Sequence, residues 1–185
     1  MKSGIRIAAI TSGPISKKNE KREGVALAVA VIGSANGIEG VLSSRVAVDG
    51  FDSTGKIIRM IKRSRFREQV KAVALNGIAI AGLNIVDVEE LYKKLRCPVI
   101  IVTRKRPRRS LLARSVRLVG KSGSEKKMKI ALLKNQNAAR KMGGFYVQAH
   151  PDIDIGAIVA TSAHLLRLSH MISSGIARGE SKGRI

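Results

Sequence analysis

Aromatic side chains are scarce in this chain of 185 residues, and tryptophan is absent altogether. Phenylalanine and tyrosine together supply only 3% of the residues. Proteins that hold single-stranded nucleic acid without sequence preference depend on several exposed rings on which the bases stack. The composition therefore argues against a stacking platform. If nucleic acid is a partner, contacts to phosphate should outweigh contacts to bases.

Cysteine is almost missing too, since Cys97 is the only one. The chain can form no internal disulfide, and it has no Cys/His spacing typical of a zinc site. Cys97 precedes Pro98 and an apolar run, which favours a small buried hydrophobe over a reactive thiol. No apolar run approaches the roughly 18 residues of a membrane-spanning helix, and no signal-peptide core opens the sequence. We therefore expect no membrane partner and a cytoplasmic location.

Acidic residues are few: 13 Asp and Glu face 35 Lys and Arg, which gives a formal net charge of +22. Between Leu91 and Ala149 stand 17 basic residues and a single acid, Glu125, so this segment alone carries +16 (17 minus 1). A surface so rich in positive charge is most simply stabilised by a polyanion, and nucleic acid is the usual one. A solvated basic face, or a surface that meets an acidic protein, is the alternative.

Hydrophobic residues make up 44% of the chain, which is too many for a disordered protein. The length favours one domain with a sizeable core. We expect this domain to span residues 1–176, with the basic segment 91–149 inside it. Residues 177–185 have no apolar face and are expected to form a flexible basic tail.

The first half of the sequence predicts three successive strands, followed by helices and strands in alternation. A helix should start at Asp52 or Ser53 as N-cap, and another at Asp87, with Glu90 placed for a capping box. The short connection between the second and third predicted strands indicates that they form an antiparallel hairpin. The continuous apolar run of the fifth predicted strand is typical of strands buried in a parallel sheet. The predicted strands are Ile5–Thr11, Val25–Ile32, Gly40–Val48, Val70–Leu75 and Pro98–Val102. This order predicts an α/β fold with a ribonuclease-H-like mixed sheet, in which an antiparallel three-strand meander is followed by parallel strands and flanked by helices.

The second half is basic and less regular. Residues Arg104–Arg109 (RKRPRR) are expected to form a loop, and Ser110–Val119 and Lys126–Gln136 to form helices. We expect Phe145–Ala149 to be an edge strand. The last helix should cover Ile153–Ile176, with a break near Thr161.

Three blocks of the sequence resemble a known family. These are VDGFDSTGKIIRMI (48–61), GIAIAGLNIVDVEELYKKLRCPVIIVTRKRP (77–107) and LRLSHMISSGIARGESKGR (166–184). They are similar to the archaeal domain-of-unknown-function family 99, which looks related to endonuclease V and so to the ribonuclease-H-like nucleases. The resemblance implies the same fold that the element order predicts, and a nucleic acid as substrate or partner.

The chain departs from the pattern of that family at two places. Members carry two aspartates in a GIDDGPF-like segment of the first strand, whereas this chain has AITSGPI, with Thr11 and Ser12 in the aspartate positions. Near the C-terminus the family has EPLRLAH, whereas this chain has HLLRLSH from His164 to His170. The resemblance implies a site in which carboxylates bind two divalent ions. One of these carboxylates would stand at the end of the fourth strand, where this chain has Asn76. We therefore expect no catalytic residue, no metal site and no cofactor.

Asp49 and Asp52 offer the main alternative, because together they could bind one metal ion. An acid at a helix start is more often a cap, and we apply the same interpretation to Asp87, Glu89 and Glu90. His164 and His170 are six residues apart and do not share a helical face. None of these groups predicts a catalytic centre on its own.

The sequence thus predicts a protein that binds RNA, possibly ribosomal, or duplex DNA through phosphates, on a nuclease-like fold without its metal site. The alternatives are a metal-dependent endonuclease of endonuclease V type and an assembly protein for an acidic partner. The predicted nucleic-acid-binding residues are Lys62, Arg63, Arg65, Arg104, Lys105, Arg106, Arg108, Arg109, Arg114, Arg117, Lys121, Lys126, Lys127, Arg140, Lys141, Arg178, Lys182 and Arg184.

Overall fold

The computed structural model describes residues 4–15, 24–119 and 122–181. Its strands are β1 (Arg6–Ser12), β2 (Val25–Ser34), β3 (Gly37–Ala47), β4 (Val70–Leu75), β5 (Ala79–Ile80), β6 (Asn84–Ile85), β7 (Val99–Thr103), β8 (Arg140–Met142) and β9 (Phe145–His150). Its helices are α1 (Ser53–Lys62), α2 (Val88–Leu95), α3 (Arg109–Val119), α4 (Gly123–Lys134) and α5 (Gly156–Arg178).

Seven strands form one mixed sheet in the order β3-β2-β1-β4-β7-β9-β8. The pairs β1–β2 and β2–β3 are antiparallel, whereas β1–β4 and β4–β7 are parallel. This confirms the expected α/β fold, in which a meander of three strands leads into parallel strands.

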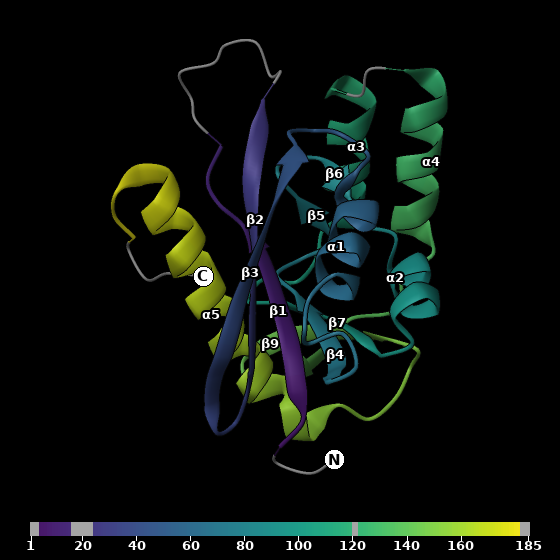
Figure 1. Cartoon of the computed structure of the whole chain (residues 1–185). Helices are drawn as coiled ribbons and strands as arrows, with labels where there is room; N and C mark the ends of the chain where they lie inside the picture. The colour runs from purple at the N-terminus through teal and green to yellow at the C-terminus, as the bar shows by residue number, and fades with distance from the viewer. Residues whose placement is uncertain (1–3, 16–23, 120–121, 182–185) are drawn as a thin grey trace.

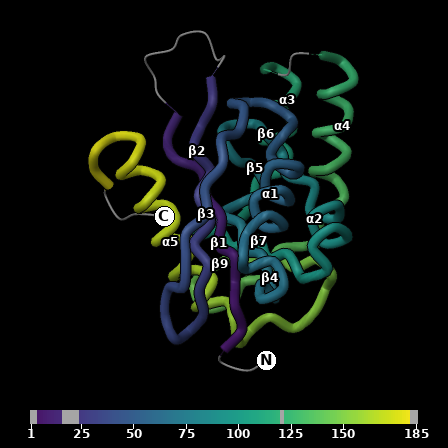
Figure 2. Tube along the Cα trace, in the orientation of Figure 1, coloured from purple at the N-terminus to yellow at the C-terminus, as the bar shows by residue number. Residues whose placement is uncertain are grey.

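Helices cover the sheet on both faces (Figure 1, Figure 2). On one face α1 and α2 bury a core that includes Ile10, Ile57 and Leu91. On the other face α5 buries a second core with Ile7 and Leu165. Helices α3 and α4 lie side by side, and a small cluster of Ile85, Val116 and Leu133 joins them to β6. In both views α5 stands apart from the other four helices, with the first strands of the sheet between.

The edge of the sheet differs from the sequence prediction. Strand β9 is not an edge strand, because it pairs with β7 on one side and with β8 on the other. Gly143 and Gly144 turn the chain between β8 and β9 with φ of 52° and 84°. Two successive residues at positive φ are typical of the tight hairpin turn that suits twisted strands. The Gly-Gly pair directly before the predicted strand Phe145–Ala149 was the signal for this hairpin.

Several boundaries also differ. The connection 76–84 contains a small hairpin of β5 and β6, and α5 continues without a break through Thr161. Helix α5 ends at Arg178, two residues beyond the predicted end of the last helix at Ile176. Arg109 belongs to α3 and not to the preceding loop. Among the described residues, no helix is both long and apolar enough to cross a membrane.

Candidate nucleic-acid interface

The two residues in the family's aspartate positions face opposite sides of β1, because side chains alternate along a strand. Thr11 lies on the α5 side and is 4% exposed. Its hydroxyl oxygen is 3.0 Å from Ser169 Oγ and 3.5 Å from Ser173 Oγ. Ser169 Oγ in turn donates to the main-chain oxygen of Val29 at 2.8 Å. A network of buried hydroxyls therefore occupies the end of β1.

Helix α5 lies very close to the chain just after β1. A Cβ atom at Gly13 would be 2.8 Å from the main-chain oxygen of Ser173, so that only glycine fits there without a shift. The small residues Ser169 and Ser173 make this approach possible. The α5 backbone thus covers the end of β1, where the resemblance to a nuclease family implies an acid, and it leaves the Thr11 hydroxyl in protein contacts.

Ser12 lies on the opposite face and fastens the β5–β6 turn. Its Oγ accepts a hydrogen bond of 3.0 Å from the backbone N–H of Ala81. Asp49 joins the same turn: its Oδ1 accepts from the N–H of Leu83 at 2.7 Å, and its own N–H donates to Ala81 O at 2.9 Å. Asp49 and Ala81 both adopt positive φ, of 54° and 50°. The second turn residue, Gly82, leaves no room for a side chain, because a Cβ would lie 2.3 Å from Asp49 Oδ1.

Asp52 has a scaffold role as well. Its Oδ1 accepts hydrogen bonds from the N–H of Ala47 at 3.1 Å and from Asn84 Nδ2 at 2.8 Å. It stands at the N-cap position of α1 but makes no side-chain cap bond, which corrects the sequence prediction. The N–H of Ser53 is instead bonded to Asn84 Oδ1 at 3.2 Å. The carboxylates of Asp49 and Asp52 therefore each hold backbone in place. Asp87, by contrast, caps α2 as predicted, through the N–H of Glu90.

Lys129 connects the basic helices to this region. Its side chain is 1% exposed, and its ammonium donates to Asp49 O at 2.7 Å and pairs with Glu125 Oε1 at 2.6 Å. This residue was not among those predicted from the sequence. The available signal was the spacing of four that puts Lys129 on the same helical face as Leu133, which is buried. Within the described residues, no group of three or more Asp, Glu, His or Cys side chains is placed to hold a metal ion.

A groove of about 410 Å³ opens beside the C-terminal ends of β4 and β7. It lies between Gly77, Thr103 and the facing sides of α3 and α4, and we call it the interface groove. Thr103 Oγ1 donates to Lys105 O at 2.9 Å and so holds the start of the basic loop. Arg109 NH1 donates to Gln136 O at 2.8 Å, and its NH2 to the main-chain oxygen of Asn137.

Arg109 is therefore held by two main-chain oxygens at the side of the groove, whereas the neighbouring basic side chains are exposed to solvent. Exposed in or near the groove are Arg104, Lys105, Arg106 and Arg108.

The other predicted binding residues that the structure describes are not among those lining this groove. Arg114 and Arg117 are exposed on α3, Lys127 is exposed on α4 and Lys126 is half-buried there. Arg140 pairs with Asp152 at 2.6 Å, which offsets part of its charge, and Lys141 lies next to it on β8.

Two further groups of the predicted residues lie elsewhere. Lys62, Arg63 and Arg65 lie at the end of α1, where the Arg65 guanidinium stands 4.9 Å above the Phe66 ring. Arg178 ends α5. Lys121, Lys182 and Arg184 lie outside the described residues.

Comparisons with known proteins agree with this architecture. A family model described as endonuclease dU matches residues 3–177. A UPF0215 protein of Thermococcus sibiricus is 34% identical over 193 residues, covering 98% of this chain and 97% of its own length. A UPF0215 protein of Archaeoglobus fulgidus is 31% identical over 155 residues, covering 80% and 83%.

Solved structures show the same relationship at the level of the fold. A protein of unknown function from Archaeoglobus fulgidus superposes with a TM-score of 0.79 at 23% identity, over 95% of this chain and 98% of that one. Human endonuclease V (ENDOV) superposes with a TM-score of 0.50 at 13% identity, over 85% of this chain and 74% of that one. The expected archaeal family and its likeness to endonuclease V are thus confirmed. The chain belongs to the endonuclease dU family and is built on a fold similar to that of endonuclease V.

Proposed function

We propose that this protein binds nucleic acid through its phosphates, largely without sequence preference, and does not cleave it. The observation that carries the proposal is the end of β1. A two-metal nuclease needs carboxylates there, because hard divalent ions take oxygen ligands that also balance their charge. Here Thr11 contacts Ser169 and Ser173 under α5, and Ser12 holds the N–H of Ala81. Neutral hydroxyls that are engaged in protein contacts are poor substitutes for such carboxylates.

The charge of the interface groove supports the binding half of the proposal. Arg104, Lys105, Arg106 and Arg108 are exposed beside it, so they can neutralise phosphates and release counterions. The scarcity of aromatic residues favours contacts to the backbone of a structured RNA or of duplex DNA over stacking on bases. A cytoplasmic location is part of the same proposal.

Metal-dependent cleavage is the second candidate, and the family match over residues 3–177 is what favours it. Such an enzyme would have to use acids away from β1, and Asp49 and Asp52 are the pair that the sequence singles out for this role. Both already hold backbone N–H groups through an Oδ1 atom. A metal would therefore compete with contacts that shape the β3–α1 turn.

The two candidates separate in one pair of measurements on the purified protein. Fluorescence anisotropy measures binding to an RNA hairpin and to duplex DNA at low salt. Gel electrophoresis then follows inosine-containing, deoxyuridine-containing and abasic strands after incubation with Mg²⁺ or Mn²⁺. We expect binding without cleavage products.

Asp49→Ala is the control for contaminating nuclease. Turnover that is present in the natural protein and absent from this variant would refute the proposal and establish the enzyme. Turnover that persists unchanged in the variant would come from elsewhere.

A further inference from the structure

A second basic surface lies at the opposite end of β4 from the interface groove. A hollow of about 440 Å³ opens between the C-terminal ends of α1 and α2, and we call it the α1–α2 groove. Five basic side chains and one acid line it: Lys62, Arg67, Lys71, Lys94, Arg96 and Glu68. Its formal charge is therefore +4 (5 minus 1). Glu68 is already paired with Arg67 at 3.1 Å, so it does little to offset the remaining cations.

The ends of helices explain only part of this charge. Lysine and arginine are favoured in the last turn of a helix because they stabilise its dipole, which accounts for Lys62 and Lys94. Lys71 stands on β4 and Arg67 in the connection before it, where no helix end favours a cation. Arg96 occupies a C-cap with φ of 55°, a conformation in which glycine is preferred. Helix ends alone therefore do not account for all the cations of this groove, and the Lys71 ammonium also donates to Glu68 O at 2.9 Å.

The basic surface continues along α1. A neighbouring hollow of about 520 Å³ lies between β3 and α1 and is lined by Lys56, Arg59 and Arg63, with no acid among its lining residues. Ser43 and Ser44 of β3 are among the residues that line its other side. Hydroxyls and cations along one groove are the groups that contact phosphate oxygens in nucleic-acid complexes.

The α1–α2 groove stands well apart from the interface groove. Val70, the first residue of β4, lines the α1–α2 groove, whereas Gly77, just beyond the last residue of β4, lines the interface groove. A strand of six residues is about 20 Å long. One nucleic acid that reaches both surfaces must extend over at least that distance.

We propose that α1 and the α1–α2 groove form a second phosphate-binding surface, so that the protein engages an extended, folded nucleic acid at two places at once. The inference rests on the proposed nucleic-acid binding and adds the form of the partner. Two linked contacts raise affinity through a high effective concentration, provided that the ligand spans both. Short and long nucleic acids should therefore differ in their dependence on the α1–α2 groove.

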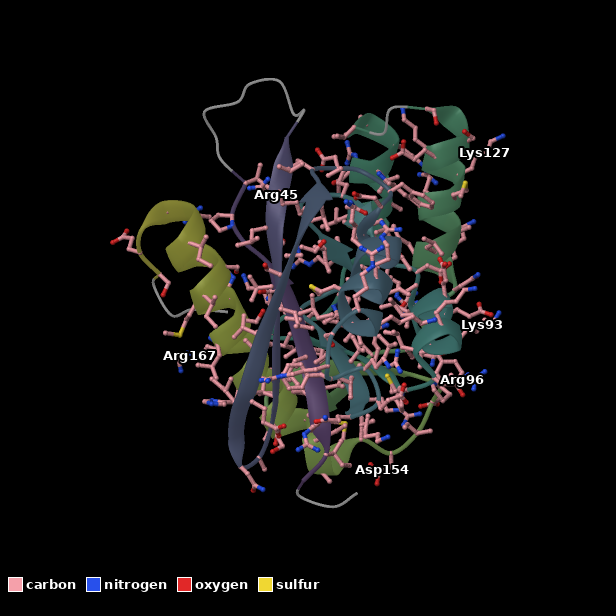
Figure 3. All side chains as sticks on the ribbon, viewed as in Figure 1. Arg45, Lys93, Arg96, Lys127, Asp154 and Arg167 are labelled. Carbon is pink, nitrogen blue, oxygen red and sulfur yellow. The ribbon has the colours of Figure 1, made fainter. Side chains whose placement is uncertain are left out.

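The experiment uses two double variants that each remove two positive charges from exposed side chains. Lys62→Gln with Lys94→Gln changes the α1–α2 groove. Arg45→Gln with Arg167→Gln is the matched control, because these residues lie on β3 and α5 (Figure 3) and neither is among the lining residues of the α1–α2 groove, the β3–α1 hollow or the interface groove. Anisotropy titrations over a range of salt use a duplex of about 20 base pairs, roughly 70 Å long, and a hairpin of about 6 base pairs.

With the long duplex we expect the groove variant to bind several-fold more weakly and to lower the slope of log K against log salt by about 1.8, or about 0.9 for each phosphate that is no longer neutralised. The control should stay within about twofold of the natural protein, because distant exposed charges are screened by salt. The short hairpin should show a smaller decrease in affinity for the groove variant.

Two outcomes would overturn the inference while the proposed function stands. In one, both double variants weaken binding equally, so that only net charge matters. In the other, the natural protein binds the duplex and the groove variant binds it just as well. A natural protein that fails to bind either probe would overturn the proposed function as well. Melting temperatures of both variants within a few degrees of the natural protein show that the fold is intact.

Discussion

Lys129 and Asp49 are joined by a hydrogen bond of 2.7 Å from the lysine ammonium to the aspartate main-chain oxygen. The two residues are 80 positions apart, and the bond attaches α4 to the turn between β3 and α1. The same ammonium pairs with Glu125, one turn earlier on α4. A buried cation thus links the basic helices to the turn that Asp49 shapes beside the end of β1.

Replacing Lys129 by methionine should destabilise the protein. The change keeps the length of the side chain but leaves Asp49 O and the Glu125 carboxylate without their donor, at a cost of about 2 kcal/mol. For a domain of this size that corresponds to a fall in melting temperature of about 4–8 °C, measured by calorimetry. Lys127→Met on the exposed side of the same helix is the control and should change little. Equal melting temperatures for the two variants would contradict a structural role for Lys129.

The exposed cations beside the interface groove should dominate affinity. Charge reversal of Arg104, Lys105, Arg106 and Arg108 should weaken binding by a similar factor on every sequence, because phosphate contacts carry no sequence information. The slope of log K against log salt should flatten by about 0.9 for each phosphate of duplex DNA that the variant no longer neutralises. Arg109 is left unchanged because it braces Gln136 and Asn137. An affinity that does not depend on salt would refute this prediction.

Restoring an acid at the end of β1 should harm the fold. In Thr11→Asp the carboxylate would be buried among Ser169 and Ser173, and burial favours the neutral form of an acid. Its pKa in the folded state should therefore exceed the unfolded value of about 3.9. The variant should be most stable below that value and should lose stability as the pH rises through the folded pKa. Chemical denaturation at several pH values measures this.

Thr11→Val is the companion variant for that experiment. It has a similar shape, lacks the hydroxyl and adds no titrating group, so its loss of stability should not depend on pH. A Thr11→Asp protein that is as stable as the natural one at neutral pH, and that cleaves nucleic acid with Mn²⁺, would show that the end of β1 can still accept a metal site.

The Cys97 thiol should be unreactive in the folded protein. Burial raises its pKa from 9.0 to about 11, and the nearby Lys71 charge opposes this rise only in part. The thiolate, which is the reactive form, is therefore rare at neutral pH. Labelling with a thiol reagent at pH 8 should be slow until denaturant is added. Rapid labelling of the native protein would show that the thiol is accessible.

The same shift predicts a loss of stability in alkali. The Cys97 thiol holds its proton more tightly in the folded state than in the unfolded state. The stability that this thiol contributes is therefore fully present below pH 9.0 and is lost as the pH rises to about 11. In Cys97→Ala this part of the pH dependence should vanish. The difference between the two denaturation profiles over that range isolates the effect from other titrating groups.

The sequence by itself determined the fold class, the family and the excess of positive charge. Apolar runs, turn residues and their order are local, so Val25–Ile32 and Val70–Leu75 could be placed on strands before any contact was known. The hairpin of β8 and β9 was missed because Arg140–Met142 is too short and polar to show a strand pattern. Helix α5 was expected to break at Thr161, yet its packing on β1 and β2 overrides that weak local preference.

Only the tertiary structure decided what the functional residues contact. The sequence shows that Thr11 replaces an acid, but its contact with Ser169 joins residues 158 positions apart. Counting charges could not separate the interface groove from the α1–α2 groove, nor reveal that Lys129 is buried. The physical reason is the same in each case: charge and hydrophobicity belong to a residue, whereas burial and partners depend on which distant segments the sheet brings together.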